Sequence, residues 1–190
     1  MAKVTVSSDP EGLVYTLEGD TTVTTKGLLR GSAHFAKEFF KDRNDLVVAE
    51  IGVHRGGNAE QIWEYLKPKI LLLVDNWDGY GETHNINYVE TWHRLHGHRE
   101  IIIIKGWSED VAKIVNLDFD YIYIDAGHDY QSITTDILSW YPKVKKGGII
   151  GGHDYFSMPA VKQVVDEWFG DKVALGEYGL AIPSTGGIGG

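Results

Sequence analysis

The sequence predicts an α/β fold: a Rossmann-like, doubly wound and mainly parallel sheet with helices on both faces. Short apolar runs rich in β-branched residues recur along the chain, and longer segments with helical periodicity separate them. Such alternation is typical of right-handed βαβ crossovers, which cover both faces of the sheet. The chain has 190 residues, of which 43% are hydrophobic and 24% charged. These values suit one globular domain with a substantial core.

Each element of the predicted fold rests on its own local pattern. The expected parallel strands are Leu46–Ile51, Ile70–Val74, Ile101–Ile104, Tyr121–Ile124 and Gly148–Ile150. The expected helices between and after them are Asn58–Leu66, Ile86–Leu95, Glu109–Val115, Ser132–Tyr141 and Pro159–Phe169. A further helix is expected within Gly27–Lys41, where apolar residues share one helical stripe.

The two ends of the chain differ in character from the middle. Residues 1–45 are expected to form an N-terminal arm or small hairpin rich in Thr and Val, followed by a helix. The core covers residues 46–182, and its last part, Lys172–Ile182, is expected to form two short strands, one of them antiparallel to the sheet. Residues 183–190 are rich in glycine and are expected to be a flexible tail. With no linker or repeat, a single domain is expected.

Composition excludes several classes of function. A net charge of −9 disfavours a nucleic-acid backbone as the main partner. No apolar run reaches the length of a membrane span, and the N-terminus lacks the layout of a signal peptide. The absence of cysteine removes disulfides and thiolate metal sites. A cytoplasmic protein without membrane or nucleic-acid partners is therefore expected.

The residues just after the strands carry the functional information, because ligands bind outside the carboxyl ends of a parallel sheet. The first strand contains Glu50 near its end, and Gly52, Gly56 and Gly57 form a turn before the next helix. Glycines allow a tight turn and close approach to a ligand, and the helix start offers free N–H groups. Asp75, at the end of the second strand, suits the hydroxyls of a ribose. A nucleotide-type cofactor is therefore expected.

The loop favours S-adenosylmethionine over a dinucleotide. His54 stands where a dinucleotide-binding loop requires glycine, because the backbone must reach the pyrophosphate there. Glu50, at the loop mouth, suits a cofactor with an ammonium group better than one with phosphates. An NAD-dependent oxidoreductase is the first alternative, and a nonenzymatic module that binds S-adenosylmethionine is the second. A DNA-base methyltransferase is a weaker third, because its Asn/Asp-Pro-Pro-aromatic loop is missing after the fourth strand.

Four segments together point to a family: Glu50–Gly57, Val74–Trp77, Tyr123–Tyr130 and Lys146–Tyr155. In these segments the chain resembles the class I S-adenosylmethionine-dependent methyltransferases. Within that class it is similar to the small-molecule O-methyltransferase branch, close to macrocin-type, cephalosporin-tailoring and catechol-type enzymes. The resemblance extends over about two-thirds of the chain, and His54 departs from it, because many members have glycine there.

The resemblance implies a set of cofactor-binding residues. Glu50 and Gly52 would line the methionine end, and Asp75 would bind the ribose hydroxyls. Trp77 or Trp107 would cover the adenine. Together with these, the residues expected at the cofactor are His54, Gly56, Ser108 and Asp125.

The resemblance also implies how a hydroxyl acceptor is activated. Asp125 and Asp154 follow the fourth and fifth strands, so their carboxylates are expected to converge. In catechol-type relatives, the metal ligands correspond to Asp125, His153 and Asp154, and the base corresponds to His128. Mg²⁺ prefers oxygen ligands, so His153 leaves open a softer divalent ion, no metal, or a role in orienting Asp154 or as a second base.

Further expectations concern the segment Trp77–His98 and the acceptor. This segment is aromatic and polar and is expected to act as a lid over the cofactor. Its histidines, His93, His96 and His98, are expected to complement a helix end rather than bind metal. The acceptor is expected to be a small-molecule hydroxyl compound, and the chain is short for the class, which suggests a pocket completed in a homodimer.

Overall fold

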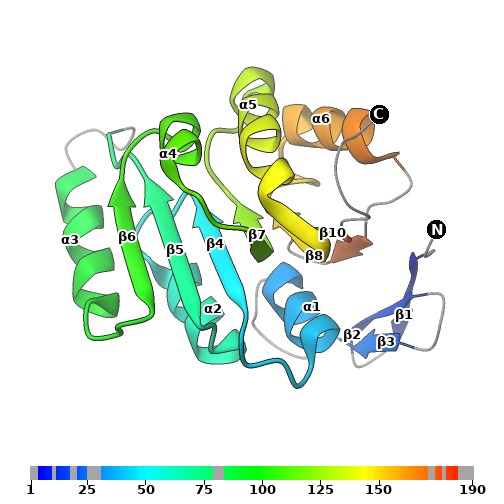
Figure 1. Ribbon diagram of the computed structural model, residues 1–190. Helices are drawn as coiled ribbons and strands as arrows, with labels where there is room; N and C mark the ends of the chain where they lie inside the picture. The colour runs from blue at the N-terminus through cyan, green and yellow to red at the C-terminus, as the bar shows by residue number, and fades with distance from the viewer. Residues whose placement is uncertain are drawn as a thin grey trace.

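The computed structural model describes residues 4–9, 12–17, 21–24, 31–78, 84–170, 174–176 and 179–183, and its main feature is a seven-stranded sheet (Figure 1). Its strands are β4 (Val47–Ile51), β5 (Ile70–Asp75), β6 (Ile101–Lys105), β7 (Phe119–Ile124), β8 (Val144–Gly152), β9 (Ala174–Gly176) and β10 (Gly179–Pro183). The order across the sheet is β6-β5-β4-β7-β8-β10-β9. The first five of these strands are parallel, and β10 is antiparallel to β8. The predicted fold class is confirmed.

The order of the strands places a switch point at β4. The chain first adds β5 and β6 on one side of β4 and then returns to add β7 and β8 on the other side. The connections after β4 and β7 therefore leave the sheet on opposite faces and open a crevice between them. This crevice holds the candidate site.

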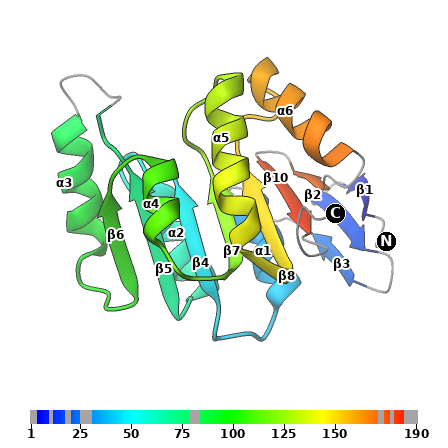
Figure 2. The same ribbon diagram turned by 45° about the horizontal axis from the view of Figure 1, so that its top comes forward.

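Helices cover both faces of the sheet (Figure 2). They are α1 (Gly31–Phe40), α2 (Gly57–Leu66), α3 (His84–Leu95), α4 (Ser108–Ile114), α5 (Tyr130–Trp140) and α6 (Pro159–Phe169). One core packs α1, α2 and α3 against the sheet, and a second core packs α4, α5 and α6 against the opposite face. Alternate strand residues enter alternate cores, as for Leu71 and Leu72 of β5. Both strand faces are apolar because both are buried.

The structure differs from the sequence-based prediction in the extent of the fifth parallel strand and in the number of strands at the N-terminus. The fifth parallel strand was expected at Gly148–Ile150, but β8 begins at Val144 and is irregular in its pairing with β7. Lys145 and Lys146 interrupt the apolar pattern there, and Lys145 bonds to the buried Asp120 instead. At the N-terminus, β1 (Val4–Asp9), β2 (Gly12–Leu17) and β3 (Thr21–Thr24) form a small antiparallel sheet beside the β10 end of the large one (Figure 1).

The two short C-terminal strands occur as expected, as β9 and β10. Residues 27–30 of the expected first helix and residues 184–190 of the expected tail lie outside the described residues, and Pro183, expected in the tail, ends β10. None of the described helices combines the length and the apolar character that crossing a bilayer requires.

Candidate active site

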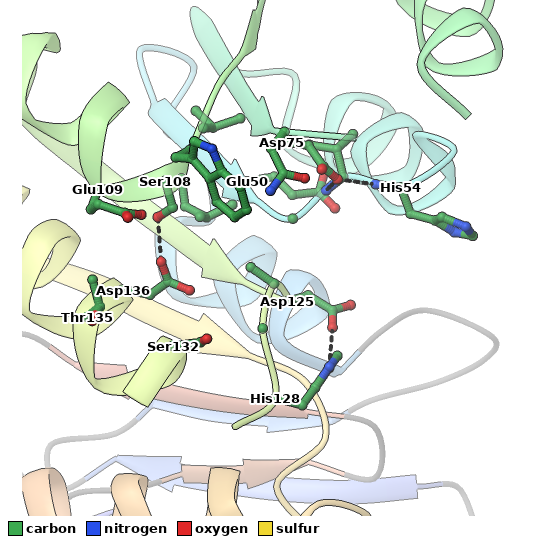
Figure 3. A pocket seen from close by; sticks show the side chains of 18 of the residues that line it. Glu50, His54, Asp75, Ser108, Glu109, Asp125, His128, Ser132, Thr135 and Asp136 are labelled. Atoms are coloured by element: carbon green, nitrogen blue, oxygen red, sulfur yellow. Dashed lines mark hydrogen bonds and ion pairs between the residues drawn. The ribbon is translucent and has the colours of Figure 1, made fainter. Parts of the chain in front are cut away.

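A cleft of roughly 1020 Å³ opens at the carboxyl ends of β4, β5 and β7 (Figure 3). Its size suits a nucleoside-bearing ligand. Acidic residues outnumber basic residues in its lining; they are Glu50, Asp75, Glu109, Asp125, Asp129 and Asp136. The basic residues in the lining are His54, Arg55 and His128. The charge of the lining therefore favours a cationic ligand over one that carries a pyrophosphate.

Gly52 brings the loop after β4 against the loop after β7. Its φ is +87°, and a Cβ built on it would lie 2.1 Å from the backbone oxygen of Asp125. The crossing of the two loops therefore requires glycine. Gly56 also has a positive φ, and it precedes α2 as the N-cap residue. The first two residues of α2, Gly57 and Asn58, line the cleft, and the start of a helix has N–H groups without partners within the helix.

Asp75 holds the loop after β4 in place. One carboxylate oxygen accepts hydrogen bonds from the backbone N–H groups of Val53 and His54, at 2.8 and 2.9 Å. The other accepts from the backbone N–H of Trp77 at 2.7 Å. The carboxylate reaches the cleft although only 8% of the residue is exposed. Its expected contact with a ribose stays a prediction, whereas its support of the loop is visible in the structure.

Trp77 lies away from the cleft, and its expected position over an adenine is wrong. Its side chain is fully buried in the core, where it packs against Tyr88 and donates a hydrogen bond from Nε1 to the carbonyl of His54 at 2.7 Å. A φ of +53° turns the backbone at Trp77. His54 in turn reaches the cleft through its backbone, and its exposed ring points away from it (Figure 3).

Trp107, by contrast, lines the cleft and is 58% exposed. It directly precedes α4, whose first residue is Ser108. Of the two tryptophans that the sequence offered for an adenine face, the structure therefore leaves Trp107. Ser108 also lines the cleft, as expected, and it hydrogen-bonds to Asp136 of α5.

Glu50 marks the other end of the cleft. It is 1% exposed, and it accepts a hydrogen bond from the side-chain amide of Asn58 at 3.0 Å. The amide oxygens of Asn58 and Gln61 are buried without a hydrogen-bond partner among the described residues. Both residues lie on α2 and line the cleft. This group of acceptors fits an ammonium ion such as that of a methionine moiety.

A cluster of three titratable groups lies at the ends of β7 and β8. The imidazole Nε2 of His128 lies 2.8 Å from a carboxylate oxygen of Asp154. It lies 3.5 Å from a carboxylate oxygen of Asp125 (Figure 3). Potential ligand atoms of the three residues all lie within 4.8 Å of one another. The convergence of Asp125 and Asp154 that the sequence predicted is therefore present.

The group with metal-ligand spacing contains His128, whereas the sequence offered His153 as a metal ligand beside Asp125 and Asp154. Asp154 has a φ of +62°, so the backbone turns sharply between the two neighbouring side chains. The Nδ1 of His153 lies 3.0 Å from the carboxylate of Asp154. This is the contact that a role of His153 in orienting Asp154 requires, and that role stays a prediction.

Asp154 is held in its charged form. Burial alone would raise its pKa, but hydrogen bonds from Ser157 and His153 and the charges of His153 and His128 outweigh burial. The pKa of Asp154 consequently lies below its ordinary value, and the residue is an anion at neutral pH.

The histidines at the end of α3 form no such cluster. The ring of His96 stacks on Trp92 at 4.1 Å, and its Nδ1 contacts the backbone carbonyls of Trp92 and His93. His98 packs against Trp63. Within the described part of the chain, Asp125, His128 and Asp154 are the one group with metal-ligand spacing.

Comparison with known proteins decides the class. Residues 49–155 match the model of the methyltransferase domain family. The chain belongs to this family. This match and the Rossmann-like fold confirm the sequence-based assignment of the chain to the class of S-adenosylmethionine-dependent methyltransferases. The matched range contains the loop after β4, Asp75, Asp125 and Asp154.

The methyltransferase has a viral relative of undescribed function and many structural neighbours. It is 32% identical over 144 residues to uncharacterized protein R132 of Acanthamoeba polyphaga mimivirus, and the match covers 70% of this chain. The matched region spans 64% of the length of that relative.

Solved structures resemble the methyltransferase in fold at low sequence identity. The O-methyltransferase NovP has a TM-score of 0.59 and 19% identity, with 80% of this chain and 77% of that chain covered. SMU.1697c, a putative methyltransferase from Streptococcus mutans in complex with SAH, has a TM-score of 0.62 and 12% identity, with 82% of this chain and 99% of that chain covered. MycE, in complex with Mg, SAH and mycinamycin VI, has a TM-score of 0.54 and 16% identity, with 82% of this chain and 50% of that chain covered.

Sequence reasoning missed some residues of the cleft, chiefly Asn58, Gln61 and Asp136. Asn58 and Gln61 follow the glycine turn within the first turns of α2, where position alone could have indicated them. Asp136 falls on the buried stripe of α5 with Ile133, Ile137 and Trp140. An acid at helical spacing within an apolar stripe was the signal for it.

Proposed function

We propose that this methyltransferase transfers a methyl group from S-adenosylmethionine to a hydroxyl group of a small molecule, with His128 as the general base. The observation that carries the proposal is the position of His128 at the edge of the cleft, with Nε2 2.8 Å from a carboxylate oxygen of Asp154 and 3.5 Å from one of Asp125. The fold likeness to NovP, an O-methyltransferase, supports hydroxyl as the acceptor.

The cofactor end of the site has the chemistry that S-adenosylmethionine requires. Bound there, S-adenosylmethionine would supply a methyl group on a positively charged sulfur. Glu50, with the amide oxygens of Asn58 and Gln61, would hold its amino group, and Asp75 would hold its ribose. Asp125 lies in the lining between these groups and the base, where its negative charge favours a cation.

The base is prepared by its neighbours. The carboxylate of Asp154 lies 2.8 Å from Nε2 of His128, and this contact favours the proton of the neutral ring on that nitrogen. Nδ1 is then the atom that accepts the proton of the acceptor hydroxyl. Because Asp154 is an anion at neutral pH, it also stabilises the imidazolium that results. His153, through its own contact with Asp154, keeps this carboxylate in position.

A divalent metal is a second way for the same cluster to activate a hydroxyl. Two carboxylates and an imidazole, with ligand atoms within 4.8 Å, form a donor set for such an ion. Nitrogen in this set favours Mn²⁺ or Zn²⁺ over Mg²⁺. A bound ion would lower the pKa of the hydroxyl. MycE, a neighbour in fold, contains Mg, which supports a test for metal here.

The first prediction separates binding from turnover. Asp154→Asn should leave the affinity for S-adenosylhomocysteine unchanged and reduce methyl transfer by at least about 100-fold, since base catalysis contributes that much or more. Calorimetry gives the affinity, and transfer of labelled methyl to a panel of diols, sugars and phenols gives the turnover. The matched control is Asp166→Asn, an exposed acid on α6 outside the cleft lining, which should preserve both.

Two outcomes would revise the proposal. Equal loss of affinity in Asp154→Asn and Asp75→Ala would mean that Asp154 belongs to the cofactor site. Turnover that a chelator abolishes and Mn²⁺ restores would establish the metal, whereas turnover insensitive to the chelator would leave base catalysis by His128 alone.

A further inference from the structure

A second, smaller pocket lies beside the cluster of Asp125, His128 and Asp154, between α5 and α6. The two helices lie side by side on the same face of the sheet (Figure 2). The volume of the pocket is roughly 50 Å³. Apolar side chains from both helices and from β8 line it, namely Ile133, Ile137, Ile150, Val161, Val165 and Phe169. None of them lines the cleft that holds the methyl donor in the proposal above.

The pocket is long and narrow. On α6 its wall contains Val161, Val165 and Phe169, which follow one another at intervals of four residues on one face of the helix. Eight residues of helix extend over about 12 Å. A wall of this length around a volume of roughly 50 Å³ suits an unbranched chain rather than a sugar or a substituted ring.

The walls of the pocket offer little to water. Its polar side chains are those of Asp125, His128 and His153, and all three follow directly after β7 and β8. Away from these residues the walls are aliphatic or aromatic. A cavity without polar partners holds water poorly, and its walls lack the dispersion contacts that a filled site has. An apolar group that fills the pocket is therefore stabilised there.

The pocket and the cleft meet at His128. This residue lines both, and so do Asp125, Ala126 and Gly127, which precede it in the loop after β7. A ligand with its apolar end in the pocket therefore has its polar end at the proposed base. The loop that contains the base also lines the cleft for the methyl donor.

We propose that the methyl acceptor has a short unbranched alkyl chain next to its hydroxyl group, and that this chain enters the pocket between α5 and α6. The inference rests on the proposed function, because it takes His128 as the base that receives the hydroxyl proton. The hydroxyl would stay at the mouth, beside His128 and His153, and the chain would extend along Val161 and Val165. A sugar would instead place further hydroxyl groups against apolar walls, where they find no partners.

The experiment uses vicinal diols as probes, because they keep one polar end and differ only in the length of an unbranched chain. The protein, saturated with S-adenosylhomocysteine, is titrated with the diols that have a methyl, ethyl, propyl or butyl chain. We expect the affinity to rise about fourfold with each added methylene until the pocket is full. This arm needs no variant and is independent of any folding defect.

Two further probes test the shape and the polarity of the pocket. One has a tert-butyl group in place of the butyl chain, so that it is an isomer of the longest diol. The other has an additional hydroxyl group at the far end of the butyl chain. Each should bind at least about fivefold more weakly than the butyl compound, the first because it is too wide and the second because its hydroxyl is buried without a partner.

Methyl NMR of the isoleucine-labelled protein locates the bound chain. The signals of Ile133, Ile137 and Ile150 should shift during the titration, because these residues line the pocket. Ile149 is the internal control, since it adjoins Ile150 on β8 and faces the opposite core. Its signal should stay in place. Equal shifts at Ile149 and Ile150 would contradict binding in the pocket.

Val165→Ala and Val164→Ala form a matched pair on α6. Both residues are buried valines of the same core, but only Val165 lines the pocket. Val165→Ala widens the pocket, so the tert-butyl compound should gain at least about fivefold in affinity relative to the butyl compound. Val164→Ala should keep the wild-type preference. Thermal unfolding of both variants measures the loss of stability that they share.

Methyl transfer to the same diols tests the connection between the pocket and the base. With a labelled methyl donor, kcat/KM should rise with chain length as the affinity does. If affinity or transfer is independent of chain length, if no diol accepts a methyl group, or if Val165→Ala keeps the wild-type preference, the inference about the pocket is wrong and the binding of S-adenosylhomocysteine still stands. If S-adenosylhomocysteine itself does not bind, the proposed function fails, and the assignment of the pocket to an acceptor fails with it.

Discussion

Gly52 and Gly57 lie five positions apart in one turn and have different physical roles. Gly52 combines a left-handed backbone with the close crossing of Asp125, so a side chain has neither the conformation nor the space it needs. Gly57 begins α2, its φ is not positive, and a Cβ built on it meets no heavy atom within 4 Å. A shared glycine-rich pattern therefore contains one position that the site requires and one that tolerates change.

This difference leads to a prediction for stability. Gly52→Ala should lower the free energy of unfolding by about 2–4 kcal/mol, from the left-handed conformation and the clash together. Gly57→Ala should raise it by about 0.5 kcal/mol, because alanine restricts the unfolded chain and favours the helix. Urea unfolding of both variants measures the two values. Similar changes in both would contradict the crossing of the loops at Gly52.

At the residue scale, the sequence predicts the place of a residue in the fold where that residue directly follows a strand. Asp75, Asp125 and Asp154 reach the site because the apolar runs show where strands stop. The direction of a side chain one or two residues beyond a strand depends on a backbone angle that no pattern specifies. For this reason Trp77, with its positive φ, was misplaced. The exchange of His153 for His128 has the same cause.

At the scale of elements, α3 supports the cofactor loop without lining the cleft. The hydroxyl of Thr91 lies 3.0 Å from the carbonyl oxygens of both His54 and Asn87. The indole of Trp77 also donates to the His54 carbonyl, and Arg55 bonds to Asn87. Gly56 lies close to Thr91, because a Cβ built on Gly56 would lie 3.2 Å from atoms of Thr91. The segment that the sequence suggested as a lid therefore contributes a fixed contact to the turn, and its closure over a cofactor stays a prediction.

The contact between α3 and the loop should control affinity rather than chemistry. Thr91→Val removes one hydrogen bond to the His54 carbonyl and should weaken S-adenosylhomocysteine binding by about three- to tenfold. KM for the methyl donor should rise with kcat nearly unchanged, because binding in the ground state is what is lost. Steady-state kinetics with calorimetry measure both.

Thr134→Val provides the control for this prediction. Thr134 is a helical threonine whose hydroxyl bonds to the carbonyl four residues earlier, and it lies on α5 outside the cleft lining. It should leave affinity and turnover unchanged. A fall in kcat for Thr91→Val without any change in KM would mean that α3 acts on the transfer step instead.

At the scale of the whole molecule, the fold brings acidic side chains together at the carboxyl edge of the parallel strands. The formal net charge is −9, and six acids from β4, β5, the loop after β7, α4 and α5 line one cleft. The parallel topology places the ends of these strands together, so the position of the site followed from the sequence. The acceptor did not follow, because it depends on loops and surfaces that share no pattern with the core.

The acidity of the cleft makes the choice of ligand the most direct test. Titration calorimetry should compare S-adenosylmethionine, S-adenosylhomocysteine and NAD at low and at physiological salt. We expect one-to-one binding of both adenosyl ligands, with the cationic methyl donor favoured most at low salt, and no measurable binding of NAD. Binding of NAD alone, or of none of the three, would contradict the assignment of this cleft to the methyl donor.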